Sequence, residues 1–280
     1  MTTFTLGLVQ LSAGPSLAPN LRMAAEQVRV AVRAGADFVM APENAPIIEP
    51  DHERLRDLVP EEDRHPGVHA YAEIARGLGV WLLLGSTPVR VGDDRLANRS
   101  ILFDPQGQIA ARYDKIHMFD VNVPDGQTYH ESATFQPGDR AVTADLPWGR
   151  LGLSICYDLR FPQLYRALGR AGAELIAVPA AFTEFTGQAH WHALLRARAI
   201  ETGAYIAAPA QCGVHAGERR TYGHSLVVGP WGEIVAESDD APDVITAEID
   251  LAAVRTARAR IPALEQDRDF TGPGEATAAP

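Results

Sequence analysis

The sequence has few cysteines and no long apolar run. Its 280 residues include only two cysteines, Cys156 and Cys212, so there is no disulfide framework and each thiol serves either core packing or chemistry. No apolar run reaches the roughly 18–20 residues that a membrane-spanning helix needs. The N-terminus also lacks the basic region and long apolar stretch of a secretory signal. We therefore expect a protein of the reducing cytoplasm, without a membrane partner.

Basic residues are also scarce, and the formal net charge is −11 at pH 7. This balance argues against an extended surface for nucleic acid or anionic lipid, although a local cationic pocket for an acidic substrate is compatible with it. The phosphate loop, the dinucleotide fingerprint, the C-x-x-C and H-E-x-x-H motifs and the G-x-S-x-G elbow are missing. The closely spaced pairs His65/His69 and His190/His192 have no third ligand in register, so we expect no metal and no organic cofactor.

Short apolar segments alternate with helical patterns along the chain, which is typical of an α/β fold. The expected strands cover residues 5–9, 36–40, 80–84, 151–155, 175–178, 205–208 and 244–249. The expected helices cover residues 21–32 (capped by Asn20), 67–78, 162–171, 188–202 and 251–260. Because no linker divides the chain, we expect one domain over residues 1–270 and a disordered small-residue tail over residues 271–280.

One internal repeat is visible. Residues 100–111 (SILFDPQGQIAA) align with residues 225–236 (SLVVGPWGEIVA), and each copy predicts a β-hairpin with a Pro-x-Gly turn. The offset of 125 residues is far too long for a solenoid. It fits two similar halves of one domain, in which two sheets pack together with helices outside; two unrelated hairpins are the alternative.

The segment 150–162 (RLGLSICYDLRFP) places Cys156 at the end of an expected strand. Gly152 and Ser154 share the face of Cys156, so two small residues leave space beside the sulfur. Pro162 suits the first turn of a helix, and ligands of open α/β sheets bind where strands lead into helices. A thiol at this point serves as a nucleophile if a neighbouring base or cation raises its thiolate fraction. Taken alone, however, the segment is explained better by a buried structural cysteine.

Two further side chains complete a mechanism. Glu43 directly follows an apolar strand at the start of the long loop Pro42–Pro66, and a carboxylate fixed at a strand end can act as a general base. Lys115 follows the first hairpin, and a fixed ammonium can stabilise an oxyanion. Taken individually, each is explained better as a surface residue. Together with Cys156 they would let the thiol attack an amide or nitrile carbon, with Glu43 moving the proton and Lys115 holding the oxyanion.

The three motifs resemble the nitrilase, or carbon–nitrogen hydrolase, superfamily, whose signature is a Glu–Lys–Cys triad in this order. The resemblance is carried by Pro-Glu43, by Lys115-x-His-x-Phe-Asp and by Ile-Cys156-Tyr-Asp-x-Arg-Phe-Pro, and it runs from about residue 4 to 262. It implies a four-layer α-β-β-α sandwich, and it implies assembly as a homodimer or a higher homo-oligomer.

Within the superfamily the chain resembles the Nit-type amidase branch, which includes deaminated-glutathione amidases and omega-amidases. The resembling stretches are residues 115–121, 131–132, 186–191, 196–201, 210–213 and 222–232. The implied function is hydrolysis of a small carboxylate-bearing amide, such as deaminated glutathione or an omega-amide of an α-keto acid, to a carboxylate and ammonia. The alternatives are an N-carbamoyl amino-acid amidohydrolase, another aliphatic amidase, or a catalytically silent small-molecule-binding protein.

The resemblance also implies residue roles. Glu43 becomes the general base and acid, Lys115 stabilises the tetrahedral intermediate, and Cys156 is the nucleophile. Glu131 matches a second glutamate that positions the lysine and the substrate, and the backbone N–H of Tyr157 becomes a second oxyanion donor. For the substrate, Arg160 is implied to hold a carboxylate and Thr186 to contact the ligand; a structural arginine that ties down a loop is the alternative for Arg160.

Overall fold

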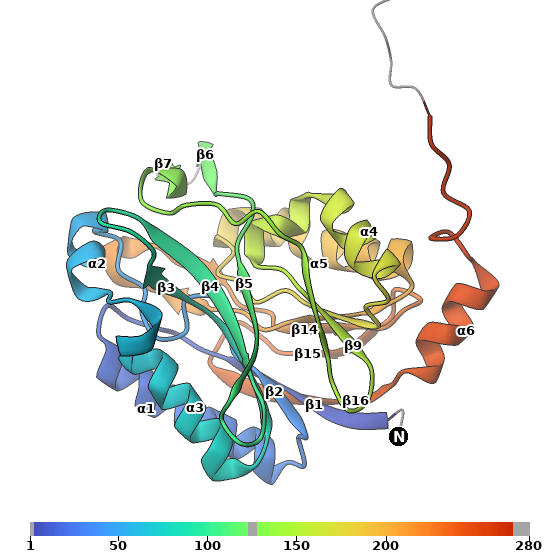
Figure 1. The fold of residues 1–280 in the computed structure, drawn as a ribbon, viewed down its shortest axis with the longest axis horizontal. Helices are drawn as coiled ribbons and strands as arrows, with labels where there is room; N and C mark the ends of the chain where they lie inside the picture. Colours follow the sequence, from blue (N-terminus) through green and yellow to red (C-terminus); the bar gives the residue numbers. More distant parts are fainter. Residues whose placement is uncertain (1–2, 123–127, 271–280) are drawn as a thin grey trace, which may run out of the picture.

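The computed structural model describes residues 3–122 and 128–270. Two six-stranded sheets lie face to face between two layers of helices (Figure 1). The first sheet has the order β16 (Asp243–Asp250), β1 (Thr3–Gln10), β2 (Phe38–Met40), β3 (Trp81–Arg90), β4 (Leu96–Phe103) and β5 (Ile109–Asp114). The second has the order β15 (Ile234–Glu237), β14 (Leu226–Val228), β11 (Tyr205–Ala208), β10 (Leu175–Ala177), β9 (Arg150–Leu153) and β8 (Val142–Asp145).

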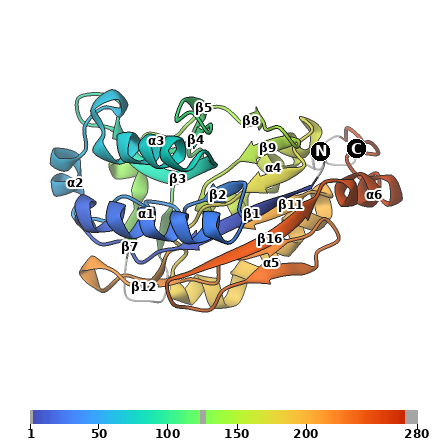
Figure 2. The same cartoon turned by 90° about the horizontal axis from the view of Figure 1, so that it is seen from below.

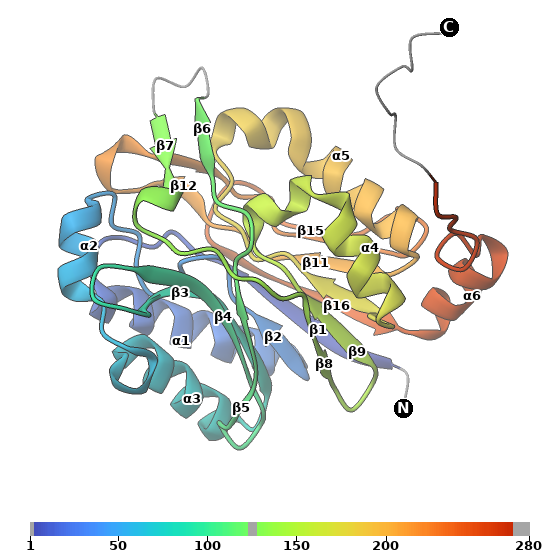
Figure 3. The same cartoon turned by 45° about the horizontal axis from the view of Figure 1, so that its top comes forward.

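The helices cover the outer faces of this pair of sheets. Helices α1 (Leu17–Arg33) and α3 (Pro66–Leu78) lie on the first sheet, and α4 (Pro162–Arg170) and α5 (Glu184–Thr202) lie on the second (Figures 1 and 3). One buried apolar cluster joins the inner faces, with Leu6 and Met40 from the first sheet and Leu153 from the second. A separate cluster packs α1 and α3 against the first sheet. The expected four-layer α-β-β-α sandwich is therefore confirmed.

The internal repeat corresponds to equivalent places in the two sheets. In the first sheet, three parallel strands (β1, β2, β3) are followed by the antiparallel hairpin β4–β5. In the second, three parallel strands (β9, β10, β11) are followed by the antiparallel hairpin β14–β15. The turn glycines Gly107 and Gly232 have φ of 75° and 87°, a backbone conformation that glycine adopts without steric cost. The two halves thus share one topology, as the repeat suggested.

The ends of some elements differ from the sequence-based expectations. Asn20 does not cap the first helix, which begins three residues earlier at Leu17. Its side chain is buried inside the helix, where it donates to the carbonyls of Gly14 and Pro46 and accepts from Gly14 N–H. Helix α5 begins at Glu184 rather than near residue 188, because the Thr183 side chain caps it.

Several short elements were not expected. They are the strands β6 (Asp120–Asn122), β7 (Thr128–His130), β8, β12 (Cys212–Val214) and β13 (Arg220–Tyr222), together with helix α2 (His52–Leu58) in the long loop. Helix α6 (Ala252–Arg260) follows the edge strand β16, which runs along the sandwich beside β1 (Figure 2). Among the described helices, none is long and apolar enough to cross a membrane. The expected tail at residues 271–280 lies outside the described residues.

Candidate active site

Cys156 lies on a tight turn between β9 and α4. It begins a short 3-10 segment (Cys156–Arg160) that leads directly into α4 at Pro162. Its φ is +48°, a left-handed conformation that non-glycine residues rarely adopt, and its N–H donates to the carbonyl of Pro179 over 2.9 Å. Backbone strain of this kind is concentrated at functional sites. The turn holds the nearly buried thiol at the carboxyl end of the parallel strands.

Glu43 follows β2 and is almost completely buried. Its Oε1 accepts from Lys115 Nζ over 3.0 Å and from Asn98 Nδ2 over 2.9 Å. Its Oε2 accepts from the N–H of Ala181 over 2.9 Å. The side chain is therefore held on both oxygens by groups from three different segments.

Lys115 follows β5 and reaches the same point from the other side. Its ammonium, which is only 2% exposed, lies between two carboxylates: 3.0 Å from Glu43 and 2.9 Å from Glu131. Glu131 is in turn held by the N–H of Phe119 over 2.7 Å and by Asn98 Nδ2 over 3.3 Å. Glu131 thus fixes the position of the ammonium, the arrangement that its match to the second family glutamate implies.

The electrostatics fix one resting protonation state. Burial, the largest single effect, would raise the pKa of Glu43, but the Lys115 ammonium, a hydrogen bond with Cys156 and the charge of Arg219 together outweigh burial, and the pKa is lowered. Burial likewise opposes the charge of Lys115, yet Glu131 and Glu43 raise its pKa above the usual range. Burial and the Glu43 carboxylate both raise the pKa of Cys156. At neutral pH the site therefore contains a neutral thiol beside an ionised carboxylate and an ammonium.

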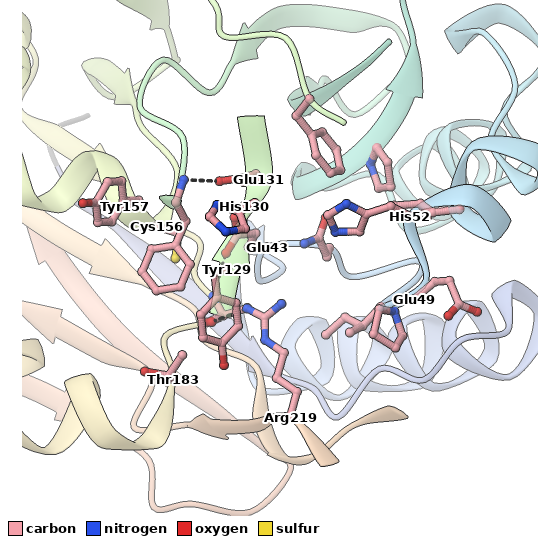
Figure 4. A pocket seen from close by; sticks show the side chains of 18 of the residues that line it. Glu43, Glu49, His52, Tyr129, His130, Glu131, Cys156, Tyr157, Thr183 and Arg219 are labelled. Carbon is pink, nitrogen blue, oxygen red and sulfur yellow. Dashed lines mark hydrogen bonds between the residues drawn. The ribbon is translucent and has the colours of Figure 1, made fainter. Parts of the chain in front are cut away.

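These side chains open on one cavity of about 460 Å³ (Figure 4). Its lining includes Glu43, Lys115, Glu131, Cys156 and Tyr157, so the structure brings together the residues that the motifs singled out. The loop Pro42–Pro66 supplies another part of the wall, including helix α2 residues. Tyr157 lies in the first turn of the 3-10 segment, where N–H groups have no partner within the helix. That position suits the oxyanion role expected of its N–H, which remains a prediction.

The two expected substrate contacts have different positions. Thr186 lines the cavity, and its Oγ1 lies 2.9 Å from Thr183 Oγ1. Arg160 is not among the residues that line the cavity in the described part of the chain. Its guanidinium lies 5.8 Å from the centre of the Tyr157 ring and 5.4 Å from that of Phe182, and it contacts His190 Nδ1 at 3.3 Å.

Several polar residues of the site were missed, among them Asn98 and Arg219. Asn98 on β4 bonds both glutamates, but Arg99 and Ser100 are polar neighbours on the same strand, so the local sequence did not distinguish it. Arg219 lines the cavity from the loop before β13, and nothing in its local sequence distinguished it from neighbouring Arg220. Cys212, the other cysteine, is a fully buried free thiol, as a packing role requires.

The histidines lie mostly outside the site. His117 donates its N–H to buried Asp158, and its ring Nδ1 lies 2.6 Å from the same carboxylate, a structural role. His192, His224 and Glu237 have ligand atoms within 4.8 Å of one another, close enough to hold a metal ion. In the structure both histidine rings contact the same Glu237 oxygen instead, at 2.7 and 3.1 Å. None of the three lines the catalytic cavity.

Known proteins share this arrangement of sequence and fold. The family model described as carbon-nitrogen hydrolase matches residues 5–259. A deaminated glutathione amidase of Yersinia enterocolitica is 43% identical over 271 residues, which cover 96% of this chain and 94% of that protein. The crystal structure of the C. elegans NitFhit protein superposes with a TM-score of 0.87 at 36% identity, covering 96% of this chain and 66% of that one.

A third relative shows a reacted cysteine. A mutant amidase of Nesterenkonia sp. AN1, 26% identical with a TM-score of 0.78 over 92% of this chain and 98% of that one, was solved after Michael addition of acrylamide at its active-site cysteine. With a family match across nearly its whole length and a buried Glu43–Lys115 pair beside Cys156, the chain belongs to the carbon–nitrogen hydrolases of the nitrilase superfamily.

Proposed function

We propose that the protein hydrolyses a linear amide whose acyl chain carries a carboxylate, with deaminated glutathione as the preferred substrate. The observation that carries this proposal is the convergence of Cys156, Glu43 and Lys115 on one cavity, in a chain 43% identical to a deaminated glutathione amidase. Deaminated glutathione is a secondary amide, so its leaving group is the amine of cysteinylglycine. The ammonia expected from the sequence applies to primary amides such as the omega-amides.

The resting protonation state allows a complete cycle. Sulfur of Cys156 attacks the amide carbon while its proton passes to Glu43, and the oxyanion forms beside Lys115 and the N–H of Tyr157. Glu43 then gives the proton to the amide nitrogen, the C–N bond breaks, and the amine leaves a thioester. Water gives a proton to Glu43 and attacks the thioester carbon; the C–S bond breaks, and the sulfur recovers its proton.

Turnover of a small amide panel tests the proposal. The panel is deaminated glutathione, α-ketoglutaramate, an N-carbamoyl amino acid and a simple nitrile, with amine or ammonia release as the readout. We expect the first to react fastest, and Cys156→Ala to be inactive on all. Faster release from the N-carbamoyl compound would show instead that the protein is an N-carbamoyl amino-acid amidohydrolase. A protein that releases nothing, with a Cys156 that does not react with iodoacetamide, would be a binding protein.

We also propose that residues 1–270 form one domain that works in the cytoplasm as a homodimer or larger homo-oligomer. Support for assembly comes from three exposed apolar side chains near the end of α5: Ile200, Trp231 and Ile261, exposed by 55%, 55% and 57%. The turn that carries Trp231 packs against Ile200, since a Cβ at Gly232 would lie 2.7 Å from Ile200 Cδ1. Ile200 and Ile261 line the same surface hollow, and contiguous apolar surface of this kind marks protein interfaces. We call these three residues the apolar patch.

A further inference from the structure

Three side chains outside the catalytic cavity meet beside the edge strand β15. His192 lies on α5, His224 lies between β13 and β14, and Glu237 ends β15. Glu237 Oε1 is 2.7 Å from His192 Nε2 and 3.1 Å from His224 Nδ1. Within residues 3–122 and 128–270, this is the only group of three or more His, Cys, Asp or Glu side chains whose ligand atoms all lie within 4.8 Å of one another.

The geometry of this group is close to that of a zinc site. Zn²⁺ binds imidazole nitrogen at about 2.0–2.1 Å and carboxylate oxygen at about 2.0–2.2 Å, usually in a tetrahedron. Two ligand atoms of such a tetrahedron are therefore about 3.4 Å apart. Because the separations of 2.7 and 3.1 Å are slightly shorter, the Glu237 oxygen has to withdraw by less than about 1 Å to admit the ion.

Both histidines are held in position by their surroundings. Trp191, the fully buried neighbour of His192 on α5, donates its indole N–H to the carbonyl of His224 over 2.8 Å. The N–H of His224 donates to the carbonyl of Asp239 over 3.1 Å. The His224 ring stacks on Tyr222 with centroids 4.3 Å apart, and the His192 ring meets both of these rings edge-on. Ligands that are oriented before the ion arrives bind it at a lower ordering cost.

The group is accessible and has the chemistry of a transition-metal site. The three side chains are between a quarter and a third exposed, so an ion reaches them from solvent. His224 also lines a surface hollow of about 190 Å³, which Asp240 shares. Imidazole nitrogen suits zinc and the neighbouring transition metals, whereas Mg²⁺ and Ca²⁺ prefer a shell made of oxygen alone. Two imidazoles and one carboxylate therefore favour a zinc-like ion.

We propose that His192, His224 and Glu237 bind a divalent transition-metal ion of the zinc class, with water completing its coordination. The bound ion connects α5, the β13–β14 connection and β15, so it stabilises the second half of the sandwich. None of the three residues lines the catalytic cavity, and the proposal is independent of the proposed function. The sequence paired His192 with His190, where no third ligand was in register; the fold instead supplies two ligands from distant segments.

Calorimetric titration of ZnCl2 into untagged Cys156→Ala protein tests the proposal, because this parent lacks the catalytic thiol as a competing zinc ligand. We expect one equivalent of zinc to bind with a Kd of about 10 μM or below. Adding His192→Gln or Glu237→Gln should weaken binding at least about tenfold, since even the partners that orient metal ligands contribute 10–100-fold. His69→Gln is the matched control: His69 is an exposed histidine on α3, on the other sheet, and its loss should leave zinc affinity unchanged.

Two further measurements distinguish coordination from attraction to an acidic protein. The net charge of −11 attracts any divalent cation, so MgCl2 titrated under the same conditions should show no stoichiometric binding. Co²⁺ absorbs visible light strongly in a four-coordinate site and weakly as the six-coordinate aqueous ion. We expect the strong absorption in the parent and in His69→Gln, and its loss in the two ligand variants. Saturating zinc should raise the melting temperature by about 5 °C only where the site is intact.

The possible results separate clearly. A parent protein that takes up no zinc, or that keeps the same zinc affinity after both His192→Gln and Glu237→Gln, would overturn the proposal. Equal binding of Mg²⁺ and Zn²⁺ would show general attraction to the acidic surface and would also overturn it. If a ligand variant failed to fold, the Co²⁺ spectrum of the parent would still decide, because the spectrum of the aqueous ion there would exclude a coordinated metal.

Discussion

Tyr113 and Asp158 connect the segment that carries Lys115 to the turn that carries Cys156. The Tyr113 hydroxyl, on β5 of the first sheet, donates to Asp158 Oδ2 over 2.6 Å, beyond the end of β9 in the second sheet. Asp158 is fully buried and also accepts from the N–H groups of Ile155 and His117. One carboxylate therefore fixes the relative positions of two catalytic groups that come from different sheets.

Asp158→Asn is expected to lower both stability and kcat. Asp158 accepts hydrogen bonds from three donors, whereas asparagine would turn an NH2 group toward at least one of them. Two donors would then face each other, and a buried donor left unsatisfied costs about 1–3 kcal/mol. The melting temperature should fall by several degrees, since 1 kcal/mol corresponds to roughly 2–4 °C in a domain of about this size. Calorimetry and steady-state kinetics measure the two effects. Tyr113→Phe removes only one donor and should cost less; an equal or larger loss would contradict the assignment.

Glu43→Gln is expected to change hydrolysis and thiol reactivity in opposite directions. Loss of the general base lowers kcat by about 10²–10⁴-fold. The Glu43 carboxylate raises the pKa of the Cys156 thiol, so its removal lowers that pKa and increases the thiolate fraction near neutral pH. Iodoacetamide should therefore alkylate Cys156 faster in the variant, as followed by mass spectrometry between pH 6 and 9.

Cys212 is the internal control for this alkylation experiment. It is fully buried, and burial raises its pKa to about 12, so it should react slowly in both proteins. Slower alkylation of Cys156 in Glu43→Gln would mean that the glutamate promotes the resting thiolate instead of suppressing it.

Glu131→Gln tests the second glutamate as a positioning residue. The substitution keeps the shape of the side chain but removes one of the two charges that hold Lys115. Loss of a charge-assisted hydrogen bond of about 1.5–3 kcal/mol corresponds to a roughly 10–150-fold lower kcat, with KM affected less. Asn98→Ala, which removes the amide shared by both glutamates, should act in the same direction. If Glu131→Gln changed only KM, its role would be substrate binding.

The sequence predicted features that depend on neighbouring residues and missed those that depend on contacts between residues distant in the chain. Cys156, Glu43 and Lys115 stand beside apolar strands and within ordered motifs, so local pattern and family resemblance identified them. The hairpin repeat likewise indicated the two related halves. Arg219 and Asn98 acquire their importance only from contacts across the fold, with Ala181 for the first and with two glutamates for the second. Local pattern does not encode such contacts, which is also why Asn20 was misread as a cap.

His65 is expected to make the fold sensitive to acid. Its buried ring caps α3, with Nδ1 accepting from the N–H of Gly67 over 3.0 Å, and burial lowers its pKa from 6.5 to about 4. Because the unfolded chain binds a proton at higher pH than the folded one, stability is complete above pH 6.5 and declines as the pH falls toward 4. The full decline corresponds to about 3 kcal/mol.

Urea unfolding of wild type and His65→Asn at pH 7, 6, 5 and 4.5 measures this contribution. Asparagine is a good N-cap but does not titrate, so the difference between the two proteins isolates His65 from other groups. Buried His215, whose pKa burial also lowers, acts equally in both. The variant should lose less stability than wild type on acidification; parallel curves for the two proteins would exclude His65 as the cause.

Trp231→Glu is expected to dissociate the proposed oligomer. The substitution places a charge in the apolar patch, where an interface would bury it without a partner, and unpaired buried charges are strongly disfavoured. Light scattering coupled to size exclusion at micromolar concentration should show a larger species for wild type and a monomer of about 30 kDa for the variant. Leu58→Glu is the control, because Leu58 is also an exposed apolar residue (42% exposed) but lies on α2, at the opposite end of the molecule from α6 (Figure 1). A monomeric wild type, or dissociation by Leu58→Glu alone, would show that the patch is not the interface.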